Sequence, residues 1–145
     1  MARVRDILAG KPGPTHTIPL TATVYEAIQR MVEHNVGALV VTDDDGIAGI
    51  FTERDHLRRV TVPERPPRQT PVREVMTSKL YYVEPETEVT VCMSLMTRER
   101  LRHLPVMEGK ALVGMISIGD LVKQVAEERA LEVRHLTGYI TGERA

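Results

Sequence analysis

In the first half of the chain, one segment has the apolar spacing of a helix. Two segments with the pattern of strands follow it. Residues 24–34 carry apolar side chains at i, i+3, i+4, i+7 and i+8, which predicts a helix with one buried face. These positions are Val24, Ala27, Ile28, Met31 and Val32. Residues 38–41 form a continuous apolar run, typical of a strand covered on both faces. Residues 47–51 predict a second strand after a turn-forming Asp-Asp-Asp-Gly sequence.

The second half of the chain repeats this order of elements. Each half reads strand, helix, strand, strand, helix, which predicts an α+β fold made of two β-α-β-β-α units. In the second half the buried helical stripe is Val89, Cys92, Met93 and Met96. The predicted strands are 15–18, 38–41 and 47–51, then 80–83, 104–107 and 111–116, and the last helices of the two halves are 52–60 and 119–135.

A seven-residue sequence occurs twice and fixes the register of the two halves. Residues 49–55 read Gly-Ile-Phe-Thr-Glu-Arg-Asp and residues 114–120 read Gly-Met-Ile-Ser-Ile-Gly-Asp, a separation of 114 − 49 = 65. Apolar pairs elsewhere keep this separation: Ile18 and Val83, Val24 and Val89, Ile28 and Met93, Met31 and Met96, Val36 and Leu101, Val41 and Val106. A fixed period of this length indicates that a whole supersecondary unit is duplicated.

The segments that precede the two units are also similar to each other. Residues 3–9 predict a short helix ended by Gly10 and Pro12, and a related phrase follows at 72–76, with a separation of 72 − 4 = 68. Four prolines between the units predict an irregular linker. The predicted organisation is a first repeat at 4–60, a linker at 61–71, a second repeat at 72–136 and a C-terminal tail at 137–145.

Composition narrows the classes of function. The chain has 145 residues, of which 42% are hydrophobic, a net charge of −1 and a pI near 6.5. This nearly neutral charge does not indicate a basic surface that would bind nucleic acid or an anionic membrane. No apolar run reaches the roughly 18–20 residues that span a bilayer. The N-terminus has no long apolar segment after its charges, so no secretory signal is expected. The single cysteine, Cys92, favours a reduced, cytoplasmic setting.

The sequence carries no signature of an enzyme or of a metal site. Asp43, Asp44 and Asp45 could suggest a metal, but they lack the spacing and distal glutamate of a calcium loop, so a solvated hairpin turn is favoured. Cys92 lies on an apolar helical stripe and is expected in the core. The five histidines show no paired metal spacing, and there is no glycine-rich phosphate loop.

The duplicated motif resembles that of the CBS (cystathionine β-synthase) domain family. The resemblance is carried by residues 49–55, by residues 114–120 and by Arg-His-Leu-Pro-Val at 102–106, and it covers about residues 4–136. It implies a tandem CBS pair, often called a Bateman module, of the stand-alone type found in bacteria and archaea. Such a pair is expected to pack with pseudo-two-fold symmetry, to sense adenosine nucleotides and to form dimers.

Four motif residues suit the ribose of such a nucleotide. The resemblance implies that Asp55 and Asp120 accept the ribose hydroxyls, with Thr52 and Ser117 one turn earlier at the same sugar or at the phosphate. Backbone amides at a helix start add a positive end. The same spacing is that of a capping box, so the alternative is that the two hydroxyl residues are only N-caps and the two aspartates their partners.

A phosphate-binding site requires cationic side chains, and the two repeats differ in the cationic residues that they carry. The resemblance implies that Arg102 and His103 meet phosphate in the cleft of the first motif, where arginine offers a bidentate fork. The first repeat has Gly37 and Ala38 at the corresponding positions, although Arg54 can reach the cleft of the second motif. The two clefts are therefore expected to be chemically unequal. Alternatively, the Arg-His pair is a solvated part of a basic stretch.

Two functions from different classes follow from these expectations. The first is a non-enzymatic regulatory module that senses AMP, ADP, ATP or NAD(H), with a ligand-dependent change in packing that an unknown regulated protein reads. The second is a dimerisation or interaction module with empty clefts. A homodimer is expected, because apolar residues on the last helix leave surface that one module does not cover. Adenine is expected to contact Ile18, Leu39, Val83 and Pro105.

Overall fold

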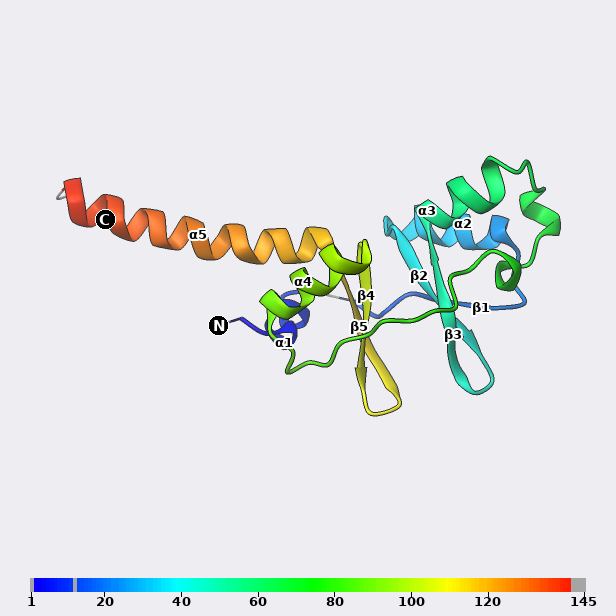
Figure 1. Ribbon diagram of the computed structural model, residues 1–145, viewed down its shortest axis with the longest axis horizontal. Coiled ribbons are helices and arrows are strands. Elements are labelled where there is room, and N and C mark those ends of the chain that lie inside the picture. Colours follow the sequence, from blue (N-terminus) through cyan, green and yellow to red (C-terminus); the bar gives the residue numbers. More distant parts are fainter. Residues whose placement is uncertain (1, 12, 142–145) are drawn as a thin grey trace. The chain divides into compact units, whose positions relative to one another are not determined.

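The chain folds into two compact units, and each combines strands with helices (Figure 1). The computed structural model describes residues 2–11 and 13–141, with side chains described to residue 134. Unit 1 contains Val83–Val106 with the segments before Gly13 and after Gly114, and unit 2 contains Gly13–Tyr82 with Met107–Gly114. The prediction of an α+β fold with two repeats is confirmed.

Unit 2 is built on a three-stranded sheet in the order β1-β2-β3. β1 is parallel to β2, and β2 is antiparallel to β3. The strands are β1 (Thr17–Pro19), β2 (Ala38–Asp43) and β3 (Gly46–Thr52). Residues 38–41 are all buried, as expected for a strand covered on both faces. In the β2–β3 turn the Asp45 N–H donates to Oδ1 of Asp43 at 2.8 Å, which confirms the predicted hairpin turn.

Helix α2 (Val24–His34) begins and ends where the sequence predicts. The Thr23 hydroxyl oxygen accepts from the Glu26 N–H at 3.2 Å, and Asn35 closes the helix in the left-handed region with φ of 53°. Most of the predicted stripe packs into the core of unit 2. Val32 does not, because it lies at the outer edge of the stripe and is 76% exposed, so its assignment to the buried face is wrong.

The helix after the first motif differs from the expected one in its geometry. Instead of one α-helix over 52–60, a single turn, α3 (Glu53–Asp55), leads into a π-helical stretch, η1 (His56–Thr61). The Val62 N–H donates to the Leu57 carbonyl oxygen at 3.0 Å, which is the five-residue spacing of a π-helix. Helical periodicity in the sequence predicts that a helix forms here, but it does not distinguish α from π spacing over so few residues.

The second repeat shows the predicted helices with a longer last helix. Its elements, with the N-terminal helix, are α1 (Val4–Ala9), α4 (Val89–Glu99), β4 (His103–Glu108), β5 (Ala111–Ser117) and α5 (Ile118–Thr141). Cys92 is fully buried on α4, as predicted. Burial raises the pKa of its thiol to about 11, against a backbone hydrogen bond that lowers it, so the thiol stays protonated at neutral pH.

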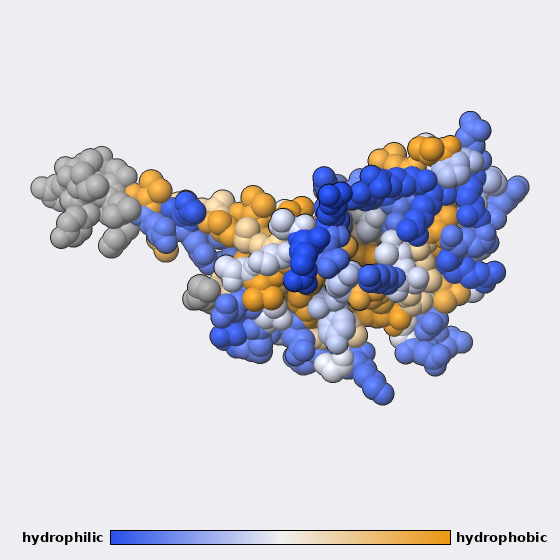
Figure 2. All heavy atoms as spheres, viewed as in Figure 1, coloured by the Kyte–Doolittle hydropathy of each residue, from blue (hydrophilic) through white to orange (hydrophobic). Residues whose placement is uncertain are grey.

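Helix α5 continues well past the rest of unit 1, and it includes part of the predicted tail at 137–145 (Figure 1). Residues 142–145 of that tail lie outside the described residues. Val122, Leu131 and Val133 are each more than half exposed, whereas Leu121 is fully buried. Figure 2 shows apolar side chains at the surface along this helix.

The strand predicted at 80–83 is wrong, and a proline explains why. Within this described stretch only Val83 pairs, in an isolated parallel bridge with β4. In the first repeat the Val40 N–H donates to the His16 carbonyl oxygen at 3.2 Å and extends the β1–β2 pairing. The corresponding residue of β4 is Pro105, which has no N–H to donate. The parallel ladder therefore stops after one bridge.

Each lead-in segment packs against the repeat that it does not directly precede. The second lead-in forms a 3₁₀ turn, η3 (Val72–Glu74), in which the Val72 N–H donates to the Ala22 carbonyl oxygen at 2.8 Å. The first lead-in makes the equivalent bond to the other repeat, from the Val4 N–H to the Thr87 carbonyl oxygen at 2.9 Å. Each motif is therefore flanked by the lead-in that precedes the other repeat.

Candidate functional site

The first motif forms a closed cap at the start of α3. The Asp55 N–H donates to the Thr52 hydroxyl oxygen at 3.2 Å. In return, Oδ2 of Asp55 accepts from the Thr52 N–H at 3.0 Å and from the Thr52 hydroxyl at 3.1 Å. This is the capping box that the spacing allows as an alternative. The structure brings the two residues together as predicted, and their contact with ribose stays a prediction.

Asp55 has two more partners, both from outside the motif's first turn. The Thr77 hydroxyl donates to Oδ1 at 2.9 Å, and Nε of Arg59 lies 3.8 Å from the same oxygen. Asp55 is only 7% exposed, so protein donors rather than bulk water solvate its carboxylate. Loss of that carboxylate would leave partly buried donors without an acceptor. Asp55 therefore stabilises the fold as well as being a candidate ligand residue.

Gly49 is required by a close approach of the chain. A Cβ atom at this position would lie 2.6 Å from the Thr77 carbonyl oxygen and 2.9 Å from Sδ of Met76. Thr77 is held there by two backbone hydrogen bonds with Ile50, of 2.8 and 2.9 Å. The glycine that opens the motif thus lets the second lead-in come close enough for Thr77 to bind Asp55.

The second motif forms the same cap but has a cation as its third partner. The Ser117 N–H donates to Oδ2 of Asp120 at 2.8 Å, and the Asp120 N–H donates to the Ser117 hydroxyl oxygen at 3.1 Å. Nζ of Lys11 donates to the same Oδ2 at 2.8 Å. Partial burial raises the pKa of Asp120, but the hydrogen bonds from Lys11 and Ser117 outweigh it and hold that pKa below its usual value.

The sequence predicts the four motif residues but not the partners of the two aspartates, Thr77 and Lys11. Lys11 is 109 residues from Asp120 along the chain, and no local pattern links the two. Thr77 directly follows the lead-in segment at 72–76, so the sequence shows where it stands relative to the second repeat. The sequence does not reveal that each lead-in packs against the other repeat. This packing brings Lys11 to the second motif and Thr77 to the first.

The predicted phosphate-binding cations lie on two elements. Arg102 directly precedes β4, and its carbonyl oxygen accepts from the Ile118 N–H at 2.8 Å, which ties this residue's backbone to the start of α5. His103 is the first residue of β4 and is half-buried. The side chains of Arg102 and of Arg54, on α3, are exposed. Their contact with phosphate stays a prediction.

The four residues proposed for adenine belong to the interiors of the units. Ile18 and Leu39 are fully buried in the hydrophobic core of unit 2. In unit 1 the Val83 N–H donates to the Pro105 carbonyl oxygen at 3.0 Å, and both residues are buried. Their role at adenine is untested.

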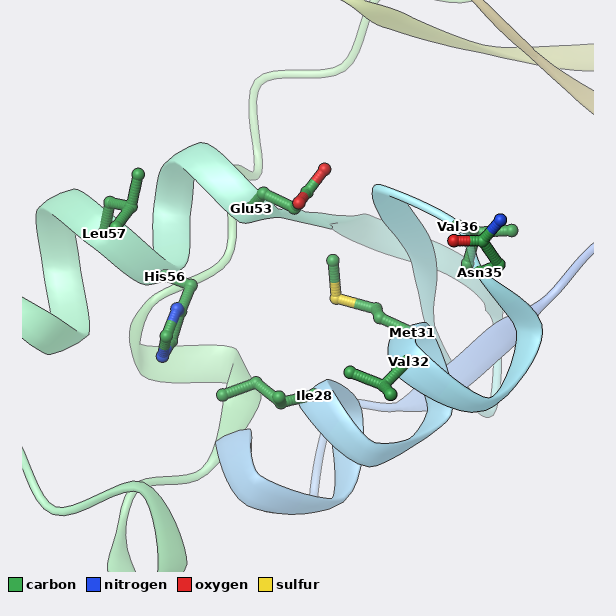
Figure 3. Close-up of a pocket in the computed structure, with 8 residues that line it drawn as sticks. All are labelled: Ile28, Met31, Val32, Asn35, Val36, Glu53, His56 and Leu57. Carbon is green, nitrogen blue, oxygen red and sulfur yellow. The ribbon is translucent and has the colours of Figure 1, made fainter.

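A separate pocket of about 380 Å³ lies between α2 and the α3–η1 helix of unit 2 (Figure 3). The residues that line it are Ile28, Met31, Val32, Asn35, Val36, Glu53, His56 and Leu57. Neither Thr52 nor Asp55 lines this pocket, although Glu53 and His56 neighbour them in sequence. It is therefore an apolar groove on another side of the helix start.

The described part of the chain shows no candidate for two other kinds of site. No group of three or more His, Cys, Asp and Glu side chains there is placed to hold a metal ion. None of the described helices combines the length and the apolar character needed to cross a membrane.

Comparison with known proteins identifies the family. The profile of the CBS domain matches residues 4–60 and again residues 72–127. The chain belongs to the CBS domain family. CBS pairs are regulatory modules that generally bind adenosine ligands. The two capped helix starts described above are therefore the repeated motifs of a CBS pair.

Relatives of this CBS pair include proteins from a plant and from bacteria. The mitochondrial CBS domain-containing protein CBSX3 of Arabidopsis thaliana is 47% identical over 125 residues, and the match covers 83% of this chain and 61% of that protein. The CBS domain-containing protein YhcV of Bacillus subtilis is 34% identical, with 90% of this chain and 91% of that protein covered. A solved structure of a protein with CBS domains from Burkholderia ambifaria has a TM-score of 0.83 and 50% identity, over 86% of this chain and 93% of that one.

Proposed function

We propose that this CBS pair is a regulatory module that binds an adenosine nucleotide, namely AMP, ADP, ATP or NAD(H), at its two motifs. Thr52 with Asp55, and Ser117 with Asp120, would hold the ribose. Arg102, His103 and Arg54 would contribute to phosphate binding, with adenine near the apolar residues Ile18, Leu39, Val83 and Pro105. Binding would alter the packing of the module, and an unknown regulated protein would respond to that change.

The observation that carries this proposal is the hydroxyl–carboxylate pair at a helix start in both repeats of a CBS chain. An ionised carboxylate offers about four acceptor positions on its two oxygens. The hydrogen bonds that Asp120 accepts from Nζ of Lys11 and from the Ser117 N–H both go to Oδ2. Asp120 therefore has acceptor capacity left for a ribose diol. Oδ1 of Asp55 already accepts from Thr77, so the first motif has less.

Thermal melting with a nucleotide panel tests the proposal. A ligand at 100 times its dissociation constant should stabilise the folded state by about 2.7 kcal/mol. For a chain of this size we expect the melting temperature to rise by roughly 5–10 °C with at least one of AMP, ADP, ATP and NAD(H). Inorganic phosphate and GMP are the controls. An unchanged melting temperature with all four adenosine nucleotides at millimolar concentration would contradict the proposal.

The second candidate is a dimerisation or protein-interaction module with vestigial clefts. The exposed apolar side chains of α5 favour it, because a surface of this kind commonly contacts another protein. It predicts a homodimer by light scattering at tens of micromolar, with no stabilisation by any nucleotide. A homodimer is also our proposal for the nucleotide-binding form, so the response to nucleotide distinguishes the two candidates.

We further propose a cytoplasmic, non-enzymatic chain that binds neither nucleic acid nor membrane. A net charge of −1 supports the absence of a nucleic-acid or anionic-membrane surface. The names of the two relatives above state CBS domains and no enzymatic activity. The name of the Arabidopsis relative places that protein in mitochondria. The match to this chain spans 61% of that relative's length.

A further inference from the structure

Lys11 is held at the second motif by two hydrogen bonds. Its Nζ donates to the Met115 carbonyl oxygen at 2.7 Å and to Oδ2 of Asp120 at 2.8 Å. All three residues belong to unit 1. The side chain of Lys11 is 41% exposed and that of Asp120 is 24% exposed, so solvent reaches this ion pair.

In the first repeat a neutral residue contacts the corresponding carbonyl oxygen and the other oxygen of the corresponding carboxylate. The Thr77 N–H donates to the Ile50 carbonyl oxygen at 2.8 Å, and the Thr77 hydroxyl donates to Asp55 at 2.9 Å. Ile50 and Asp55 correspond to Met115 and Asp120, because each pair is 65 residues apart (115 − 50 and 120 − 55). An ammonium group therefore takes, in one repeat, the place that a threonine takes in the other.

The position of Lys11 in the first lead-in explains why a lysine, and not a threonine, contacts the second motif. Val4 and Val72 begin equivalent contacts, so Thr77 corresponds to residue 77 − 68 = 9, which is Ala9. Alanine has no hydroxyl to donate to Asp120. Lys11, two residues further along, is long enough to reach both acceptors from outside. The substitution of a hydroxyl by a cation is thus specific to the second motif.

A lysine ammonium has three N–H donors. Two of them are used by the contacts with Met115 and Asp120, which are the hydrogen bonds of Nζ to the described residues. The third donor is left for a ligand, and the partly exposed side chain can turn to present it. A charge-assisted hydrogen bond to an anionic oxygen is stronger than one between neutral groups.

We propose that Lys11 is a ligand-binding residue of the second motif and that it selects adenosine ligands that carry a phosphate over the uncharged nucleoside. This inference rests on the proposed function, because ribose at Asp120 is what brings the ligand beside the ammonium. The Lys11 N–H donates to an anionic phosphate oxygen while the carboxylate of Asp120 accepts from ribose. The first motif has Thr77 at this place and lacks the corresponding charge.

Calorimetric titration with AMP and with adenosine tests this role. Lys11→Met keeps much of the length of the side chain and removes its charge, and we expect it to weaken AMP at one site by about ten-fold or more. Adenosine should change by less than about three-fold, since it carries no phosphate for the charged donor to bind. Lys11→Arg should retain most of the AMP affinity. Thr77→Val, the matched variant in the first repeat, should leave the ratio of the two affinities unchanged.

Four results would overturn the inference. An equal loss of AMP and adenosine would show that Lys11 only positions Asp120, and a gain in adenosine affinity would show that it competes with the ligand. AMP binding by Lys11→Met that matches the parent would overturn this inference alone. Absence of binding by the parent to all of AMP, ADP, ATP and NAD(H) would overturn the proposed function, and this inference with it. Melting curves without ligand establish that each variant is folded.

Discussion

Gly49→Ala is expected to lower the free energy of unfolding by about 2–4 kcal/mol. The new Cβ would lie 2.6 Å from the Thr77 carbonyl oxygen, and backbone cannot move aside as a flexible side chain does. Separation of the two segments would break the paired hydrogen bonds between Ile50 and Thr77, and with them the contact of Thr77 with Asp55. Thermal melting should show a decrease of roughly 5–15 °C in the melting temperature.

Gly119→Ala is the matched control, because Gly119 is the glycine of the second motif that stands in a helix. A Cβ there would meet only Oγ of Ser117, at an ordinary contact distance of 3.6 Å. Alanine favours helix over glycine, so stability should be unchanged or higher by up to about 1 kcal/mol. Equal melting temperatures for Gly49→Ala and Gly119→Ala would refute the close approach at Gly49.

Asp55→Ala is expected to lower the free energy of unfolding by about 2–4 kcal/mol, in addition to removing a candidate ribose ligand. The substitution leaves the partly buried Thr52 N–H and Thr77 hydroxyl without their acceptor. It also removes the carboxylate that lies 3.8 Å from Nε of Arg59, although Arg59 keeps its hydrogen bonds to the Val75 and Met76 carbonyl oxygens. Chemical denaturation in the absence of nucleotide measures this cost separately from any effect on binding.

Two variants separate the buried carboxylate from simple charge effects. Glu53→Ala removes a neighbouring acidic residue that is exposed on the same turn, and it should cost no more than about 1 kcal/mol. Asp55→Asn keeps one acceptor oxygen and should lie between the parent and Asp55→Ala. If Asp55→Ala were as stable as Glu53→Ala, the hydrogen bonds of Asp55 would contribute little to the fold.

The sequence predicts the elements well where local pattern decides them. The stripe of α2, its capping residue Thr23 and its end at Asn35 all follow from side chains within a few positions. The cap of each motif is also local, because its two residues are three apart. Burial of Cys92 follows from its place on an apolar stripe. In each of these cases the interaction that forms the structure lies inside the segment that displays the pattern.

The sequence does not predict the features that depend on distant segments. β-prone residues at 80–83 do not form a strand, because pairing depends on a donor that Pro105 lacks. Val32 has the right spacing for the stripe but lies at its edge, beside the groove. The contacts of Lys11 with Asp120 and of Thr77 with Asp55 arise because each lead-in packs against the other repeat. These partners are set by topology, which periodicity alone does not reveal.

Calorimetry with AMP tests most directly whether Ser117 with Asp120, and Thr52 with Asp55, are adenosine sites. Asp120→Asn preserves the shape of the side chain and an acceptor for the Ser117 N–H, so the fold should be retained. We predict that the parent binds AMP and that Asp120→Asn weakens one site by about ten-fold or more, as expected for a lost hydrogen bond to a charged group. An AMP isotherm for Asp120→Asn identical to that of the parent, or no heat of binding with the parent for any of AMP, ADP, ATP and NAD(H) at millimolar concentration, would contradict these adenosine sites.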